Sequence, residues 1–429
     1  MYTDYQGYGN WDFRKANTKE YTHCFHIYPA MMIPQVARGL IQLYGSEGDL
    51  LFDPYCGSGT SLVEARLVGL NAVGTDINPT ARLISEAKTR DYNINKLEKE
   101  ASEYLKRLEK SLEGVEDYST FDEHPSITWT DLEKWFPKKT IGHLLTAVDE
   151  ILETKYKAAH LFLKASLSEC LRLVSFQRNG EFKLYRIEEE KRGYFYEPLL
   201  PLLTKRIERN LAGVRDFLKK TSKKTNAKIR GFNTVHTSGR SKLPGTGAAI
   251  NLVVTSPPYG DSGTTVAYSQ FSWLTNVWFG MDVRSPGALD SEMMGGKITQ
   301  INVLDFFELL KCEPLKLAFE QIHEVNRKRA GEIMQFYYDY FLSIKNVAKE
   351  VKEGGHVCYV VGNRKVCEVQ LPTDQFTAWA FEQCGFEYIT TYLRDIPNKR
   401  MPSKNSPSNE AGKKVETMHK EYLVVLRKE

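Results

Sequence analysis

The sequence predicts an α/β protein with a doubly wound, mostly parallel sheet of about seven strands, covered by helices on both faces. Two segments carry this prediction. Residues 49–76 follow the order strand, glycine-rich turn, helix and strand, and residues 253–260 form a β-branched strand that ends in Ser256-Pro257-Pro258. In such sheets ligands bind beyond the carboxyl ends of the strands, so both turns are expected at one edge.

The first of these segments has the pattern of a βαβ unit that binds a nucleoside. A helix over residues 34–44, stopped by a glycine, precedes it. The turn over residues 53–60 contains two glycines, which let the backbone approach a ligand. Asp76 follows Gly57 by 19 positions, close to the spacing of a ribose-binding carboxylate. Leu62 stands where a dinucleotide fingerprint has its third glycine, which argues against a nicotinamide cofactor.

The middle of the chain is predicted to be largely helical and carries no sharp motif. Its apolar spacing indicates helices over residues 94–117, 129–152 and 161–174, whereas residues 180–186 alternate as a strand does. A basic segment and a glycine-rich approach then lead to the second strand.

The turn that ends this second strand has the chemistry to hold an amino group. Pro257 and Pro258 have no N–H to donate, so their carbonyls and the Ser256 hydroxyl can face a ligand as acceptors. Tyr259 adds a flat ring beside them. In-plane acceptors next to a stacking ring suit a base that is flipped out and held by its exocyclic amine. The alternative is a strand that simply ends in a Pro-Pro turn.

Loops and helices alternate with strands in the last third of the chain. Loops are expected over residues 261–272 and 283–300, and helices over 301–349. A buried strand at 356–362 follows a Gly-Gly turn, and residues 386–392 and 421–426 are expected to form the last two strands.

Together the two turns resemble the S-adenosylmethionine-dependent DNA amino-methyltransferases, which modify the exocyclic nitrogen of cytosine or adenine. The resemblance covers residues 22–90 and 250–429. The segment Asp53-Pro54-Tyr55-Cys56-Gly57-Ser58-Gly59-Thr60 is similar to their cofactor motif, with Tyr55 in place of the usual phenylalanine, and Ser256-Pro257-Pro258-Tyr259 is similar to their catalytic motif. The resemblance implies a Rossmann-like methyltransferase fold with S-adenosyl-L-methionine as cofactor. It adds Tyr28, Pro29 and Ile77 to the cofactor-binding residues beside Asp76, and it implies that the last two strands pair antiparallel. No metal is expected.

Serine before Pro-Pro favours cytosine in this family, so the resemblance implies a site-specific DNA (cytosine-N4) methyltransferase of a restriction-modification system. Ser256 and the Pro257 carbonyl would accept hydrogen bonds from the amine, and Tyr259 would stack on the base. Alternatives are an adenine-N6 DNA methyltransferase and an RNA base methyltransferase. A nicotinamide-dependent oxidoreductase is opposed by the glycine pattern, and a non-catalytic DNA-binding module by the intact motifs.

The order of the motifs, with a long insert between them, resembles one class of this family, and the resemblance implies three regions. Residues 1–94 would carry the cofactor motif, residues 95–245 would form an inserted target-recognition region, and residues 246–429 would complete the catalytic domain. The expected partner is double-stranded DNA, with a cognate restriction endonuclease acting as a separate protein.

Basic residues concentrate in the second half of the insert. Residues 205–230 contain ten lysines and arginines against two acids, whereas the whole chain has a net charge of only +4. Such a concentration suits contact with a phosphate backbone. Contact is predicted for Lys219, Lys220, Lys223 and Lys224, and for Lys399 and Arg400 in a basic loop; a solvated surface is the alternative.

The composition is that of an intracellular enzyme. Of 429 residues, 41% are hydrophobic and 26% charged, as in ordinary globular proteins. No apolar run is long enough for a bilayer, and no signal-peptide pattern is present. The seven cysteines form no Cys-x-x-Cys pair, which argues against a zinc site or a disulfide framework. A prokaryotic cytoplasmic protein, associated with the nucleoid through DNA, is expected.

Overall fold

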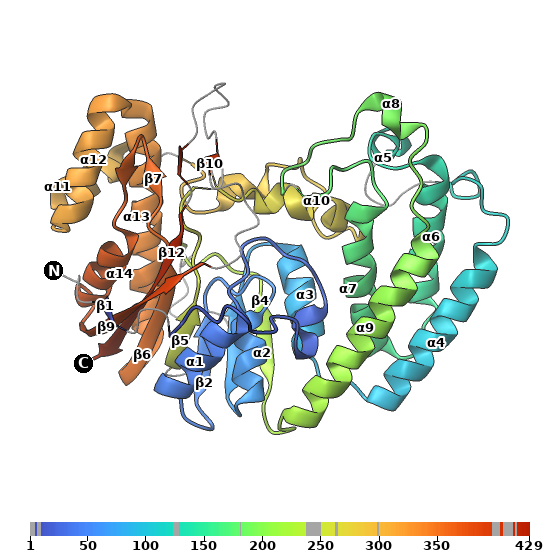
Figure 1. Ribbon diagram of the computed structural model, residues 1–429, viewed down its shortest axis with the longest axis horizontal. Coiled ribbons are helices and arrows are strands. Elements are labelled where there is room, and N and C mark those ends of the chain that lie inside the picture. Colours follow the sequence, from blue (N-terminus) through green and yellow to red (C-terminus); the bar gives the residue numbers. More distant parts are fainter. Residues whose placement is uncertain are drawn as a thin grey trace.

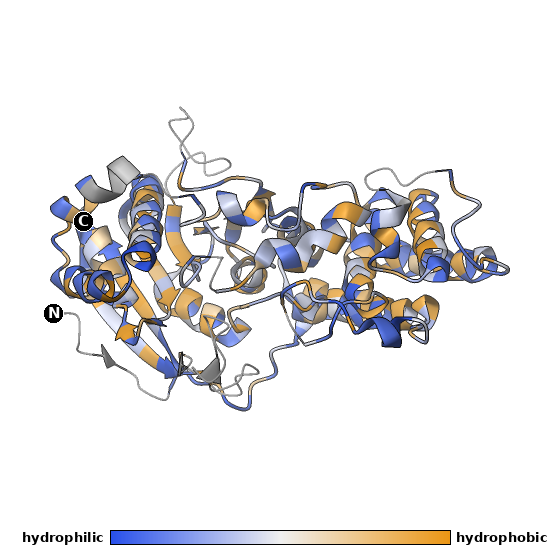
Figure 2. Cartoon of the chain, turned by 90° about the horizontal axis from the view of Figure 1, so that it is seen from above, coloured by the Kyte–Doolittle hydropathy of each residue, from blue (hydrophilic) through white to orange (hydrophobic). Residues whose placement is uncertain are grey.

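The computed structural model describes residues 5–6, 10–122, 128–180, 182–236, 250–261, 265–297, 300–396, 404–405, 415–416 and 418–429. This part of the chain forms two units side by side, an α/β unit around one large sheet and a bundle of helices (Figure 1). Seen from above, the molecule is elongated along the line that joins them (Figure 2).

The sheet confirms the predicted doubly wound architecture. Its eight described strands lie in the order β1 (Tyr5–Gln6), β9 (Phe386–Asp395), β12 (Lys420–Lys428), β6 (Val351–Val361), β5 (Ile250–Thr255), β2 (Leu50–Asp53), β3 (Asn71–Thr75) and β4 (Ala227–Arg230). Strand β12 is antiparallel to both of its neighbours, as predicted for the last two strands, and the other pairs are parallel.

The chain reverses its direction of travel across the sheet between β2 and β5. From β2 it moves outward through β3 to β4, and from β5 it moves the opposite way to β6. Such a switch point leaves a crevice at the carboxyl ends of the two central strands, where open α/β sheets bind their ligands. The predicted cofactor turn follows β2 and the predicted catalytic turn follows β5, so both border this crevice.

Helices cover both faces of the sheet, and successive side chains of a strand point alternately to the two helical layers. Leu252 and Val254 face α1 (Pro34–Tyr44) and α2 (Thr60–Leu67), whereas Val253 faces α13 (Arg327–Glu350) and α14 (Thr373–Glu382). All three side chains are fully buried. Because both faces are covered, the central strands are apolar at nearly every position.

The helical bundle follows α3 (Pro79–Thr89) in the sequence. It consists of α4 (Ile94–Ser111), α5 (Trp129–Glu133), α6 (Lys138–Leu152), α7 (Lys157–Leu173), α8 (Glu189–Arg192) and α9 (Leu199–Lys220). Helix α10 (Tyr268–Trp278) links the two units, because Leu274 and Trp278 pack in the core of the bundle (Figure 1). The bundle ends at Lys220, before the predicted boundary at residue 245, since β4 belongs to the sheet.

Three local predictions differ from the structure. Residues 177 and 186 make only an isolated bridge where 180–186 were expected as a strand. Helix α10 begins inside the loop expected over 261–272. The expected Gly-Gly turn lies within β6, at an irregularity in its pairing with β5. The remaining elements are η1 (Tyr21–Cys24), η2 (Leu289–Glu292), α11 (Gln300–Leu309), α12 (Glu313–Val325), β7 (Lys365–Val366), β8 (Val369–Gln370), β10 (Lys404–Asn405) and β11 (Val415–Glu416).

Candidate active site

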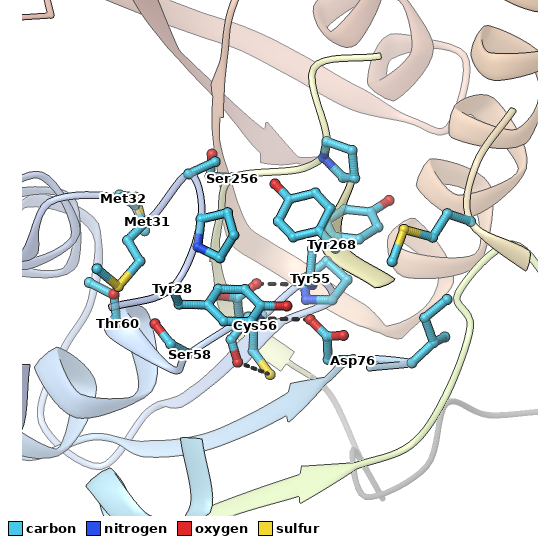
Figure 3. A pocket seen from close by; sticks show the side chains of 18 of the residues that line it. Tyr28, Met31, Met32, Tyr55, Cys56, Ser58, Thr60, Asp76, Ser256 and Tyr268 are labelled. Carbon is cyan, nitrogen blue, oxygen red and sulfur yellow. Dashed lines mark hydrogen bonds between the residues drawn. The ribbon is translucent and has the colours of Figure 1, made fainter. Parts of the chain in front are cut away.

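A cavity of about 890 Å³, counting its open mouth, lies at the carboxyl ends of β2, β3, β4 and β5 (Figure 3). It is lined by Tyr28, Pro29, Ala30, Met31, Met32, Asp53, Pro54, Tyr55, Cys56, Gly57, Ser58, Thr60, Asp76, Ile77, Phe232, Asn233, Thr234, Ser256, Pro258, Tyr268, Met293 and Met294. The two predicted turns therefore face one space. Of the residues predicted for the cofactor and for catalysis, Gly59, Pro257 and Tyr259 are not part of this lining.

The turn after β2 is held in place by its glycines and by Asp76. Gly57 and Gly59 have positive φ angles of 48° and 79°, a region that favours glycine. A Cβ on Gly59 would collide with the Ser85 side chain on α3. The Gly57 N–H donates to Asp76 Oδ2 at 3.0 Å, and the Asn78 N–H donates to Asp76 Oδ1 at 2.8 Å. Asp76 thus ties the turn after β2 to the start of α3.

The Asp76 carboxylate is poised to take further hydrogen bonds. A carboxylate has about four lone-pair sites, and the two backbone N–H groups use two of them. Burial raises the pKa of Asp76, while these two hydrogen bonds oppose the rise. Ser58 provides a second polar group, because its hydroxyl oxygen is buried without a hydrogen-bond partner among the described residues.

Asp53 joins three elements beneath the cavity. Its carboxylate accepts hydrogen bonds from the Ser61 hydroxyl on α2, from Thr255 Oγ1 on β5 at 2.6 Å, and from the Tyr55 N–H at 3.0 Å. Burial raises the pKa of Asp53 to about 6, against the effect of these donors. The residue that opens the cofactor motif therefore fixes β2 and β5 at the point where the two turns begin.

Replacing Asp53 by asparagine is expected to change how stability depends on pH. Because folding raises the pKa of Asp53, the folded state favours the protonated acid. The resulting contribution to the free energy of unfolding is full below the unfolded pKa of 3.8 and is lost as pH rises through about 6. The free energy of unfolding of Asp53→Asn minus that of the wild type should therefore grow by about 2 kcal/mol between pH 4 and pH 7. Urea unfolding across this range measures it. The exposed Asp216→Asn is the control, and a difference that does not vary with pH would contradict the expectation.

The segment before α1 closes one side of the cavity. Tyr28 is buried, accepts a hydrogen bond from Asn78 Nδ2 at 3.0 Å, and stacks on Tyr268 with ring centroids 6.0 Å apart. Ala30 has a φ angle of 50° although it is not glycine, a costly conformation that tends to occur at functional sites. Asn78 also donates to Ser272 Oγ at 2.7 Å, so α10 is fixed to this wall.

Several lining residues were not predicted. Phe232 to Thr234 follow β4, a strand that sequence reasoning missed, and Tyr268 begins a helix where a loop was expected. Met293 and Met294 come from the segment after η2. The carboxyl-end rule places residues after each parallel strand at this edge, so recognising β4 would have found Phe232.

The predicted catalytic turn connects to two strands of the antiparallel region. Ser256 Oγ lies 3.1 Å from the Tyr259 hydroxyl, which donates to Glu421 Oε1 on β12 at 2.9 Å. Arg394 on β9 donates to the other carboxylate oxygen of Glu421 at 2.6 Å. Glu421 and Arg394 were not predicted, because only the pairing of β9 with β12 brings them behind the turn.

The predicted phosphate contacts lie away from the cavity. Lys219 and Lys220 end α9, and Lys223 and Lys224 follow in the turn into β4; all four are exposed. Because β4 is parallel to β3, this turn lies at the amino-terminal edge of the sheet (Figure 1). The cavity is lined by residues that follow the carboxyl ends of the strands. The position argues against contact with a duplex engaged at the cavity. Lys399 and Arg400 lie outside the described residues.

Two kinds of feature are absent from the described part of the chain. It contains no group of three or more His, Cys, Asp or Glu side chains that could hold a metal ion. None of its helices combines the length and apolar character needed to cross a membrane.

Comparison with known proteins identifies relatives of the whole chain. The DNA methylase family model matches residues 4–87. The Type II methyltransferase M.MvaI of Kocuria varians is 38% identical over 431 residues, covering 97% of this chain and 93% of the relative. The Type II methyltransferase M.BsoBI of Geobacillus stearothermophilus is 24% identical over 428 residues, covering 88% and 81%.

A more local similarity involves a tRNA-modifying enzyme. The tRNA (guanine(10)-N2)-dimethyltransferase of Methanocaldococcus jannaschii is 34% identical over 70 residues, or 16% of this chain and 20% of the relative. M.MvaI and M.BsoBI, which match over most of the chain, are Type II methyltransferases. With the sheet and the two turns in place, the chain belongs to the DNA methylase family of S-adenosylmethionine-dependent Type II methyltransferases, the enzymes that methylate amino groups of DNA bases in restriction-modification systems.

Proposed function

We propose that the chain transfers a methyl group from S-adenosylmethionine to the exocyclic N4 amine of cytosine, at a specific sequence in double-stranded DNA. One observation carries the proposal: Ser256, at the end of β5, lines the same cavity as Asp76 and the Gly57 turn. An acceptor for an amine and a nucleoside-binding turn therefore share one space.

The residues of the cavity fit this cofactor. Asp76, with lone pairs left over, would accept hydrogen bonds from the ribose hydroxyls, and Ile77 and Phe232 would border the adenine. The Ser58 hydroxyl, which lacks a partner in the described chain, would bond the polar methionine end beside Tyr28. When bound, S-adenosylmethionine supplies an electrophilic methyl group on a positively charged sulfur.

The catalytic turn would hold the target base by its amine. The Ser256 hydroxyl and the Pro257 carbonyl would accept the two amine hydrogens, and the Tyr259 ring would stack on the flipped base. An exocyclic amine is a poor nucleophile because its lone pair is delocalised into the ring. The contribution of these residues is therefore alignment, which can supply a large part of the rate enhancement of a two-reactant step.

Serine before Pro-Pro supports cytosine over adenine as the target. The resemblance to the amino-methyltransferases associates serine at this position with cytosine-N4 enzymes, whereas asparagine or aspartate is usual in adenine-N6 enzymes. We extend this association to the present chain on the basis of Ser256.

Sequence reading is assigned to the helical bundle, from α4 to α9. Helix α10 supports this, because Tyr268 at its start lines the cavity and Trp278 at its end packs in the bundle core. We place the catalytic regions at residues 1–94 and from β4 onward, so the recognition region ends near Lys220. The chain would act on DNA in the prokaryotic cytoplasm, beside a separate cognate endonuclease.

The product identifies the target. DNA from cells that express the chain, and from cells that express Ser256→Ala, is digested to nucleosides and analysed by mass spectrometry. We expect N4-methylcytosine in the first sample and far less in the second. N6-methyladenine alone would overturn the cytosine assignment, and methylated RNA without methylated DNA would overturn the substrate class.

A further inference from the structure

The hydroxyl of Ser256 is the first member of a hydrogen-bond chain that runs away from the cavity. It lies 3.1 Å from the Tyr259 hydroxyl, which donates to Glu421 at 2.9 Å. The Glu421 side chain is 16% exposed and pairs with Arg394, whose side chain is 4% exposed. The chain therefore begins at the predicted substrate contact and ends at a largely buried ion pair between neighbouring strands.

The chemistry of each member sets the direction of this chain. A carboxylate paired with arginine has no hydrogen to give, so it only accepts. The single hydrogen of Tyr259 is then used on Glu421, and Ser256 must donate its own hydrogen to the Tyr259 oxygen. The remaining lone pairs of Ser256 Oγ are left for the cavity.

We propose that Glu421 fixes Ser256 as a hydrogen-bond acceptor and so makes the site select an exocyclic amine over a carbonyl. The proposal rests on the proposed function, in which Ser256 contacts the target base. Cytosine presents N–H donors at its N4 position, where thymine presents the O4 acceptor. A serine whose hydrogen is already committed can bond the amine and leaves the carbonyl without a donor. Glu421 is a positioning residue, because it acts through Tyr259 and Ser256.

Packing keeps the members of this chain aligned. Glu421 and Arg394 are direct partners in the register of β12 with β9. Gly362 follows the end of β6, and a Cβ there would lie only 2.9 Å from Cδ2 of the Tyr259 ring. The missing side chain at Gly362 lets the ring approach the backbone closely. The Tyr259 hydroxyl thus has a role besides the stacking of its ring.

Substitutions at two members of this hydrogen-bond chain are expected to lower kcat by different amounts. In Glu421→Gln, Arg394 can only donate, so it holds the amide oxygen and turns the amide NH₂ toward Tyr259. Tyr259 then accepts from this amide and donates to Ser256, which reverses the chain and presents the Ser256 hydrogen to the substrate. In Tyr259→Phe, Ser256 is merely released. We expect kcat to fall roughly 100-fold in Glu421→Gln and about tenfold in Tyr259→Phe.

The measurements are kcat and the KM for S-adenosylmethionine, with DNA that the wild type methylates. Glu387→Gln, an exposed acid on the neighbouring strand β9, is the control and should match the wild type. The KM should stay unchanged in all variants. In a Ser256→Ala background, Glu421→Gln should cost less than threefold further, because residues that act through one another are not additive.

The proposal would be overturned if the effects of Glu421→Gln and Ser256→Ala on kcat were fully additive. It would also be overturned if kcat stayed within twofold of the wild type in both Glu421→Gln and Tyr259→Phe. If Glu421→Gln fails to fold, as judged by thermal unfolding, Tyr259→Phe decides, because it keeps the Arg394–Glu421 pair. The product made by the wild type distinguishes a failure of the proposed function from a failure of the role given to Glu421. Without N4-methylcytosine the proposed function fails, whereas N4-methylcytosine with unaffected variants refutes only the role of Glu421.

Discussion

Replacing Asp76 by alanine is expected to weaken S-adenosylmethionine binding about 100-fold, or by about 3 kcal/mol. Two losses add up. The ribose hydroxyls lose a charged acceptor, and the N–H groups of Gly57 and Asn78 lose the carboxylate that holds the turn against α3. Titration calorimetry with the purified protein measures the affinity directly.

Asp76→Asn separates these two losses. Its amide oxygen can still accept one backbone hydrogen bond, so it should keep more affinity than the alanine variant. Ser256→Ala is the matched control, since it alters another residue that lines the same cavity. Unchanged affinity in Asp76→Ala would show that the cofactor binds elsewhere.

The Ser256→Ala variant is expected to show the converse pattern. It should lose kcat by 10- to 100-fold, because a hydrogen bond that aligns the amine is missing, while the affinity for S-adenosylmethionine stays within about twofold. Single-turnover transfer of a radiolabelled methyl group into DNA measures the chemical step. Retained turnover, or a fall that is explained by lost cofactor affinity, would contradict the role given to this hydroxyl.

Most of the cavity could be predicted from the sequence because of one geometric rule. Parallel strands end at the same edge, so an apolar strand followed by glycines and another followed by Ser256-Pro257 bring their turns together. Asp76 was found from its spacing after Gly57, at the end of the strand that follows the helix. These inferences need only local patterns and the topology of the sheet.

The residues that were missed depend on packing between distant elements. Strand β4 has only four residues, two of them exposed and basic, so its pattern is that of a charged turn, and Phe232 after it went unnoticed. Glu421 and Arg394 face the catalytic turn only through the register of β12 with β9. The lysines at 219–224 were assigned to DNA from the concentration of charge together with the catalytic motif, and neither shows which edge of the sheet carries them.

The measurement that tests the central claim most directly is a crystal structure with S-adenosylhomocysteine. We predict that the ribose hydroxyls lie within hydrogen-bond distance of Asp76, and that the methionine end lies beside Gly57 and Ser58. The sulfur should face the Ser256 turn. A ligand in another cavity, or one whose sulfur points away from Ser256, would contradict the claim that the two turns form one active site.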